Sequence, residues 1–261
     1  MIFRRRPQPE LPTLDQARPA GDFVAGVLAH LHEVVDVGWN LLEIDQEVFR
    51  MIAEAGATSC YIDYHPAFGA SPFGHVICTS VNDGVLHGRP RDYVLEDGDL
   101  LSLDLAVSVE GWVADSAISF VVGDADPADL RLIADTETVM RAGIDQVRAG
   151  ATVGDIGHAV MTTAHSLGYT INERFGGHGV GRTMHEAPFV PNHGTPGAGA
   201  ELRAGQLITV EPFLMHTTNE LEVDETDGWT QLSVDGSRGA HVEHTLYVTD
   251  GAPIILTERS R

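Results

Sequence analysis

Residues 95–104 read Leu-Glu-Asp-Gly-Asp-Leu-Leu-Ser-Leu-Asp, and residues 202–211 read Leu-Arg-Ala-Gly-Gln-Leu-Ile-Thr-Val-Glu. Both stretches contain leucine, glycine, a second apolar run and a closing acidic residue at the same spacing. Residues 115–123 and 243–251 likewise share an acidic residue, two apolar residues and a glycine in register. The chain therefore contains an internal duplication. Chance similarity of apolar patterns is the alternative, and it is weakened because the matched acids all border strand-like runs.

The repeated unit is predicted to consist of helices followed by strands. Helical spacing of apolar residues favours two helices in the first half, and capping residues begin two more in the second half. Asp126 precedes Pro127 at the start of one of these, and Thr152 with Asp155 forms a capping box at the other. The predicted helices cover about residues 23–35, 44–56, 126–147 and 152–168, and the predicted strands cover residues 76–78, 100–109 and 112–122.

This order of elements indicates an α+β fold, a duplicated helix-helix-sheet unit with pseudo-two-fold symmetry. We expect a loose, proline-rich N-terminal arm over residues 1–20 and a single catalytic domain over residues 21–261. The internal repeats would span roughly residues 21–125 and 126–255.

The composition excludes several classes of function. The net charge is −22 and all 16 basic residues are arginine, so the chain has no lysine for Schiff-base chemistry. This charge also argues against extensive nucleic-acid binding and gives no support to association with the ribosome. No apolar run is long enough for a membrane helix, and no signal-like segment follows the basic start, so we predict a cytoplasmic protein. Cys60 and Cys78 are expected to be reduced thiols.

Acidic residues inside apolar strands are the unusual feature of this sequence, because a buried charge needs a partner or a metal ion. Glu110 and Gly111 would form a two-residue hairpin turn, which places Ala106 opposite Asp115. Asp104 then lies on the same face as a diagonal neighbour of Asp115, with backbones about 7–8 Å apart. The repeat implies the same geometry for Glu211 and Glu243.

Four converging carboxylates would repel one another unless cations neutralise them. Carboxylates with an imidazole suit manganese, iron, cobalt or zinc, and two such ions can hydrolyse a substrate with a bridging hydroxide. His178 is the candidate imidazole, because the glycines on both sides allow an unusual, close-packed backbone. His87 and His185 are candidate site residues that do not bind metal, although each alone could be a structural histidine.

Five motifs together resemble type I methionine aminopeptidases. They are Ile-Cys-Thr-Ser-Val-Asn-Asp-Gly-Val-Leu-His-Gly (77–88), Gly-His-Gly-Val-Gly-Arg (177–182), Met-His-Glu-Ala-Pro (184–188), Thr-Val-Glu-Pro (209–212) and Val-Glu-His-Thr (242–245). The resemblance covers about residues 15–253. It implies the duplicated pita-bread fold and removal of an N-terminal methionine from peptides or nascent chains.

The resemblance also implies roles for individual residues. It makes Asp104, Asp115, His178, Glu211 and Glu243 the ligands of two divalent metal ions, with Asp115 and Glu243 touching both. Glu211 would also be the general base. His87 would contact the scissile amide nitrogen, and His185 would bind the substrate carbonyl and the developing oxyanion.

The pocket for the methionine side chain is implied to include Cys60, Tyr64, Cys78, Met184 and Trp229. Two departures from the family affect it. The stretch from Cys60 to Cys78, which includes residues 64–68, is longer than usual. Met184 stands where an aromatic residue commonly precedes the histidine. Plain core packing is the alternative for these apolar residues.

Two other functions remain in consideration. One is an X-Pro aminopeptidase or dipeptidase of the same superfamily, although such relatives usually carry an additional N-terminal domain for which 261 residues leave no room. The other is a non-catalytic peptide-binding module on this fold. Modules of that kind typically lose metal ligands, whereas every ligand position is filled in this chain.

Overall fold

The computed structural model describes residues 10–66 and 71–259. The helices are α1 (Leu14–Val34), α2 (Leu41–Glu54), α3 (Pro127–Ile144) and α4 (Val153–Leu167). The strands of the first half are β1 (Thr58–Ser59), β2 (Cys78–Val81), β3 (Gly84–Leu86), β4 (Leu100–Val109) and β5 (Trp112–Val121). Those of the second half are β6 (Gly176–Val180), β7 (Glu186–Pro191), β8 (Leu207–Val210), β9 (Phe213–Met215), β10 (Leu221–Val223), β11 (Gln231–Ser233), β12 (Gly239–His241), β13 (His244–Tyr247) and β14 (Ile254–Ile255).

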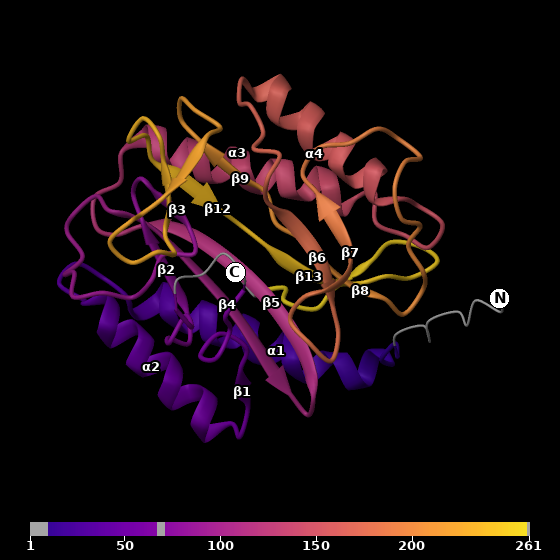
Figure 1. Cartoon of the computed structure of the whole chain (residues 1–261), viewed down its shortest axis with the longest axis horizontal. Coiled ribbons are helices and arrows are strands. Elements are labelled where there is room, and N and C mark those ends of the chain that lie inside the picture. The colour runs from indigo at the N-terminus through magenta and orange to yellow at the C-terminus, as the bar shows by residue number, and fades with distance from the viewer. Residues whose placement is uncertain (1–9, 67–70, 260–261) are drawn as a thin grey trace.

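The two helix pairs lie on opposite sides of the strands (Figure 1). Helix α1 packs on β4 and β5, whereas α3 packs on α4 and on the strands of the second half. Each half buries its own hydrophobic core: one joins α1 and α2 to β4 and β5, and the other joins α3 and α4 to β8 and β13. The predicted helix-helix-sheet unit therefore occurs twice.

The helices begin where their capping residues predicted. The Asp126 side chain accepts a hydrogen bond from the Ala128 amide at 2.8 Å, with Pro127 in the first turn. The Asp155 carboxylate accepts from the Thr152 amide at 2.7 Å, which closes the expected capping box. These contacts satisfy amide groups that have no partner inside the helix.

The predicted loose arm is wrong for residues 14–20, because they form the first turns of α1. A capping box between Thr13 and Gln16 starts the helix, and burial of Ala17 and Ala20 holds this turn against the rest of the fold. These gains offset the backbone hydrogen bond that Pro19 cannot donate. The first nine residues of the arm lie outside the described part of the chain.

The β4–β5 hairpin has the predicted turn and register. Glu110 and Gly111 both have positive φ, 53° and 78°, as a type I′ turn requires. Ala106 pairs with Asp115, and Asp104 pairs with Ala117, so the two aspartates are diagonal neighbours on one face. The pairing continues to Leu100 and Val121, which makes this the longest hairpin of the sheet.

The second hairpin departs from the geometry that the repeat implied. His244 pairs with Val210 and His241 pairs with Phe213, so Glu243 lies directly opposite Glu211 in a gap between two short ladders. Pro212 occupies this gap and has no amide to donate. The hairpin is not closed by a two-residue turn, because β10 and β11 intervene between β9 and β12.

Polar contacts join the two hairpins along β5 and β13. The Thr245 hydroxyl donates to the Asp115 carbonyl at 2.7 Å and accepts from the Asp115 amide at 2.9 Å. The Glu243 amide donates to the Ala117 carbonyl at 3.1 Å. These bonds bring the acids of both halves to one place. Across residues 10–66 and 71–259, no helix has the length and apolar character needed to cross a membrane.

Candidate metal centre and active site

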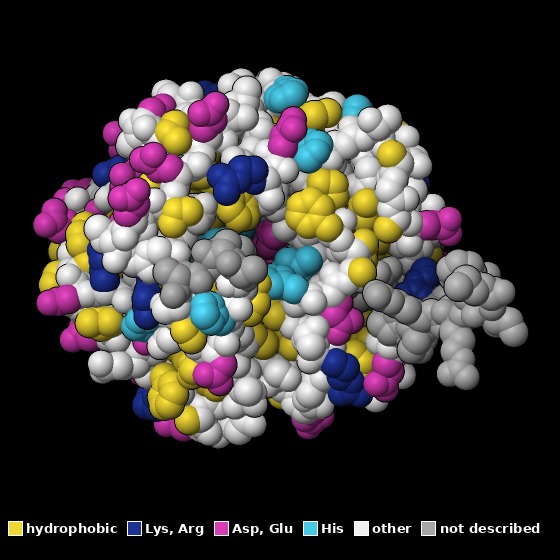
Figure 2. Space-filling model, in the orientation of Figure 1, with side chains coloured by type: hydrophobic (Ala, Val, Ile, Leu, Met, Phe, Trp, Pro, Cys, Tyr) yellow, Lys and Arg dark blue, Asp and Glu magenta, His cyan; other side chains and the backbone are white. Residues whose placement is uncertain are grey.

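A cavity of about 180 Å³ opens between the two halves, and acidic and histidine side chains reach it from both. Figure 2 shows a hollow near the centre of this face in which histidine and acidic side chains are visible. Of the residues predicted to bind metal, Asp104, Asp115, His178 and Glu211 line this cavity. Glu243 lies within ligand distance of the same group and is only 1% exposed.

Asp104 and Asp115 share a hydroxyl group that the sequence analysis did not identify. The Tyr61 hydroxyl donates to Asp104 Oδ1 at 2.7 Å and lies 3.4 Å from Asp115 Oδ1. Burial raises the pKa of Asp104 to about 6, although the Tyr61 hydrogen bond opposes this shift. The pKa of Asp115 is raised well above its usual range by burial and then by the neighbouring Asp104 charge.

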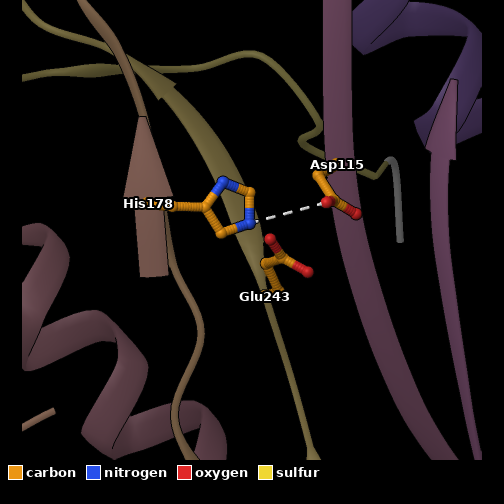
Figure 3. Close-up of side chains that lie close together, drawn as sticks. All are labelled: Asp115, His178 and Glu243. Atoms are coloured by element: carbon orange, nitrogen blue, oxygen red, sulfur yellow. Dashed lines mark ion pairs between the residues drawn. The ribbon is translucent and has the colours of Figure 1, made fainter. Parts of the chain in front are cut away.

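His178 points from β6 toward Asp115 and Glu243 (Figure 3). Its Nδ1 lies 3.0 Å from the Gly179 carbonyl oxygen, which can only accept, so Nδ1 carries the proton. The Nε2 lone pair therefore faces the acids, with Asp115 Oδ2 at 3.8 Å. Burial lowers the pKa of His178 to about 3, so the ring is neutral at pH 7. A neutral imidazole with a fixed tautomer is the form that binds a metal ion.

Close packing explains the glycines beside His178. A Cβ at Gly177 would lie 2.3 Å from the Thr209 carbonyl oxygen, and one at Gly179 would lie 2.4 Å from the Ala187 carbonyl oxygen. The neighbouring strands β8 and β7 therefore approach β6 more closely than any side chain allows. The His178 amide donates to the Thr209 hydroxyl at 2.9 Å, which fixes the strand that carries the ring.

Glu211 directly follows β8 and Glu243 directly precedes β13, and the two lie opposite one another in the gap between the ladders. The pKa values of both are raised well above the usual range, first by burial and next by the charge of Asp115. Glu243 Oε1 is fully buried and has no hydrogen-bond partner among the described residues. A buried carboxylate oxygen without a partner is costly unless a cation binds it.

His87 and His185 lie beside the acids and also line the cavity. His87 has a φ of 54°, and its Nδ1 is buried without a hydrogen-bond partner among the described residues. Burial lowers the pKa of His87 to about 4. His185 is exposed at the cavity rim, packs edge-on against His178 with ring centroids 4.3 Å apart, and has Nδ1 3.0 Å from the Tyr64 hydroxyl.

The predicted pocket residues fall into one apolar cluster. Tyr64, Cys78, Met184 and Trp229 line the cavity, whereas Cys60 packs against the same cluster without lining it. Residues 67–70 of the lengthened stretch lie outside the described part of the chain.

Sequence reasoning missed several cavity residues. They are Tyr61, Phe73, Leu86, Phe175, Phe213 and His241. His241 had a usable signal, because it lies two residues before Glu243 in a strand-like stretch of sequence, and alternate residues of such a stretch share a face. The others are apolar or aromatic residues that only long-range packing brings to the cavity.

These side chains fit divalent metal ions. Asp115, His178 and Glu243 offer ligand atoms within 4.8 Å of one another, and so do Glu211, His241 and Glu243. The chemistry of oxygen donors with imidazole suits manganese, iron, cobalt or zinc. Bound cations would lower the raised carboxylate pKa values and would give Glu243 Oε1 the partner that it lacks among the described residues.

Comparison with known proteins identifies the family of the chain. The model of metallopeptidase family M24 matches residues 15–250, and the chain belongs to this family. Within it, the chain is 39% identical to methionine aminopeptidase 1 of Mycobacterium tuberculosis, with 96% of this chain and 94% of that protein covered.

Solved structures give the same grouping. The crystal structure of methionine aminopeptidase from Rickettsia prowazekii matches with a TM-score of 0.89 and 32% identity, covering 95% of this chain and 99% of that one. The prolidase from Pyrococcus horikoshii matches with a TM-score of 0.76 and 19% identity, and this chain covers 64% of it. The second match shows a shared fold alone. The predicted pita-bread fold and family are thus confirmed.

Proposed function

We propose that the protein is a methionine aminopeptidase that hydrolyses the first peptide bond of chains with a small second residue. The observation that carries the proposal is the convergence of four carboxylates and a neutral His178 beside an apolar, thiol-containing pocket. Similarity to methionine aminopeptidases over nearly the whole chain supports it.

Two divalent ions would be held by Asp104, Asp115, His178, Glu211 and Glu243. When bound, such ions activate a water molecule and polarise the scissile carbonyl group. Glu211 is only half-buried and reaches the cavity, so it can take the proton of the attacking water. Metal analysis must determine whether these ions are manganese, iron, cobalt or zinc.

His87 and His185 would contact the peptide. His185 donates to the carbonyl oxygen as negative charge develops on it. His87 has a buried, unpartnered Nδ1 that suits the scissile amide nitrogen. Neutral rings serve both roles, because a neutral imidazole can donate at one nitrogen and accept at the other.

The pocket would hold the methionine side chain. Cys78, Met184 and Trp229 offer polarizable apolar contacts and no charged group, which suits a flexible thioether. Cys60 would contribute only by packing against this apolar cluster. Newly made chains present such N-termini in the cytoplasm, and the free thiols of Cys60 and Cys78 agree with a reducing compartment.

Removal of metal tests the proposal. A chelator should abolish peptide hydrolysis, and added Mn²⁺ or Co²⁺ should restore it. Asp115→Asn should lose more activity and bind fewer ions than Asp104→Asn, because Asp115 lies within ligand distance of both His178 and Glu243. Unchanged hydrolysis by chelator-treated Asp115→Asn protein would contradict a metal mechanism at this site.

A further inference from the structure

His241 is the last residue of β12, two positions before the proposed metal ligand Glu243. It pairs with Phe213 at the end of the β12–β9 ladder, and Glu243 lies opposite Glu211 in the gap between this ladder and the β13–β8 ladder. The pairing register is the same on both sides of this gap, and the ligand atoms of His241, Glu243 and Glu211 lie within 4.8 Å of one another. The His241 ring lines the cavity together with Glu211, although the residue is only 5% exposed.

The backbone of His241 is held firmly in this place. The Ser119 hydroxyl on β5 donates to the His241 carbonyl at 2.8 Å and accepts from its amide at 2.9 Å. Phe213 packs edge-on against the ring, with centroids 6.5 Å apart. The ring is therefore positioned by both hairpins, as a ligand requires.

Two independent observations identify a cation as the missing partner. Ligand atoms of Glu211, His241 and Glu243 all lie within 4.8 Å of one another. Separately, Glu243 Oε1 is buried without a hydrogen-bond partner among the described residues. A metal ion between these groups would bind both carboxylates and the imidazole nitrogen.

We infer that His241 is a sixth protein ligand of the metal centre and binds the ion held by Glu211 and Glu243. This inference rests on the proposed function, because it assumes that the acids bind metal. The centre would then contain two imidazoles, His178 and His241. Glu243 lies within ligand distance of both. An added imidazole favours zinc or cobalt over manganese, since manganese suits oxygen ligands better.

Paramagnetic proton NMR of the Co²⁺-loaded protein tests the inference directly. Each histidine bound to Co²⁺ keeps a proton on its other ring nitrogen, and this exchangeable proton resonates far outside the diamagnetic range. Wild-type protein with two equivalents of Co²⁺ should show two such resonances. His241→Gln should show one, and the matched control His216→Gln, which replaces a histidine paired with Asp129 outside this cavity, should show two.

The outcomes separate this inference from the proposed function. A single shifted resonance in wild-type protein, or two in His241→Gln, would overturn the ligand role of His241 and leave metal binding intact. No shifted resonance in any variant would overturn both. The number of shifted resonances in the wild-type protein tests the inference even if a variant fails to fold.

Metal preference provides a second readout. Zn²⁺ and Mn²⁺ dissociation constants can be measured by competition with a chromogenic chelator. His241→Gln should weaken Zn²⁺ binding about 10-fold more than Mn²⁺ binding, because it replaces a nitrogen ligand by an amide. Equal losses for both ions would contradict a direct bond from the imidazole.

Discussion

The proton positions of His185 follow from its contact with Tyr64. The Tyr64 hydroxyl lies 3.0 Å from His185 Nδ1, and burial raises the pKa of this phenol, so it keeps its proton at neutral pH. Donation from the hydroxyl to Nδ1 leaves the imidazole proton on Nε2. Nε2 is then the donor available to a substrate oxygen. In the proposed function, Tyr64 would position His185 in this way.

Replacement of His185 by alanine should affect catalysis more than binding. We expect kcat to fall about 10²–10³-fold with a modest change in KM, as the loss of one oxyanion donor does. Tyr64→Phe should lower kcat less, because the ring packing on Trp229 remains. Steady-state kinetics on a Met-Ala peptide measures both parameters, and a change confined to KM would assign His185 to substrate binding alone.

At the scale of elements, local signals predicted one hairpin well and the other poorly. The β4–β5 turn is encoded by Glu110 and Gly111, so its register could be counted from the sequence. The second hairpin contains β10 and β11 between its arms, and the spacing of Glu211 and Glu243 along the chain therefore does not report their register. The prediction of a loose arm was wrong for residues 14–20, because burial of α1 outweighs the helix-breaking tendency of Pro19.

The close contact between β6 and β8 can be tested with a single methyl group. Gly177→Ala places a Cβ against the Thr209 carbonyl, so β6 must move. We expect a loss of about 1–3 kcal/mol in the free energy of unfolding and weaker metal binding, because His178 moves with the strand. Urea denaturation and metal titration measure the two effects.

Gly26→Ala is the matched control. A Cβ at Gly26 meets no atom within 4 Å, and the residue lies inside α1. The alanine should stabilise the protein by about 0.5–1 kcal/mol and leave metal binding unchanged. If Gly177→Ala lowered neither the free energy of unfolding nor metal binding, the close packing beside His178 would not be required for either property.

At the scale of the whole molecule, the metal-free centre should make stability depend on pH. The carboxyl pKa values of Asp115, Glu211 and Glu243 are raised in the folded protein, so the folded state binds more protons than the unfolded one above their usual pKa. Buried His178 and His87 have lowered pKa values and oppose this effect, but only below the unfolded histidine pKa of about 6.5.

The stability of the metal-free protein should therefore fall as the pH rises from about 6.5 to about 8, where unfolded thiols begin to titrate. Urea denaturation in the presence of a chelator measures this slope. Glu243→Gln should reduce it, because one raised carboxyl group is gone. Bound metal should also reduce it, since metal displaces the protons. A metal-free stability that stayed level or rose over this range would contradict the assignment of these buried acids.

The fold could be predicted from the internal repeat together with local capping and turn signals, and the convergence of the acids with His178 could be predicted from local signals, whereas their roles as metal ligands stay a prediction. Acids that border apolar strands and a histidine between glycines can be recognised without knowing the fold. The walls of the cavity could not, because Phe73, Phe175 and Phe213 are ordinary apolar residues until distant segments pack together. His241 was overlooked although strand alternation places it beside Glu243.

The central claim is that the protein removes methionine ahead of a small residue. A tripeptide panel with the metal-loaded protein, varying the first and second residues, tests it most directly. Met-Ala, Met-Gly and Met-Ser peptides should be cleaved, and Met-Leu, Met-Lys and Met-Glu should resist, because the second residue must lie beside the metals and His87. Leucine in first place should be cleaved poorly, since a hydrophobic pocket discriminates by only about 1–3 kcal/mol per methylene. Faster cleavage of X-Pro peptides with bulky first residues than of Met-Ala would contradict the account.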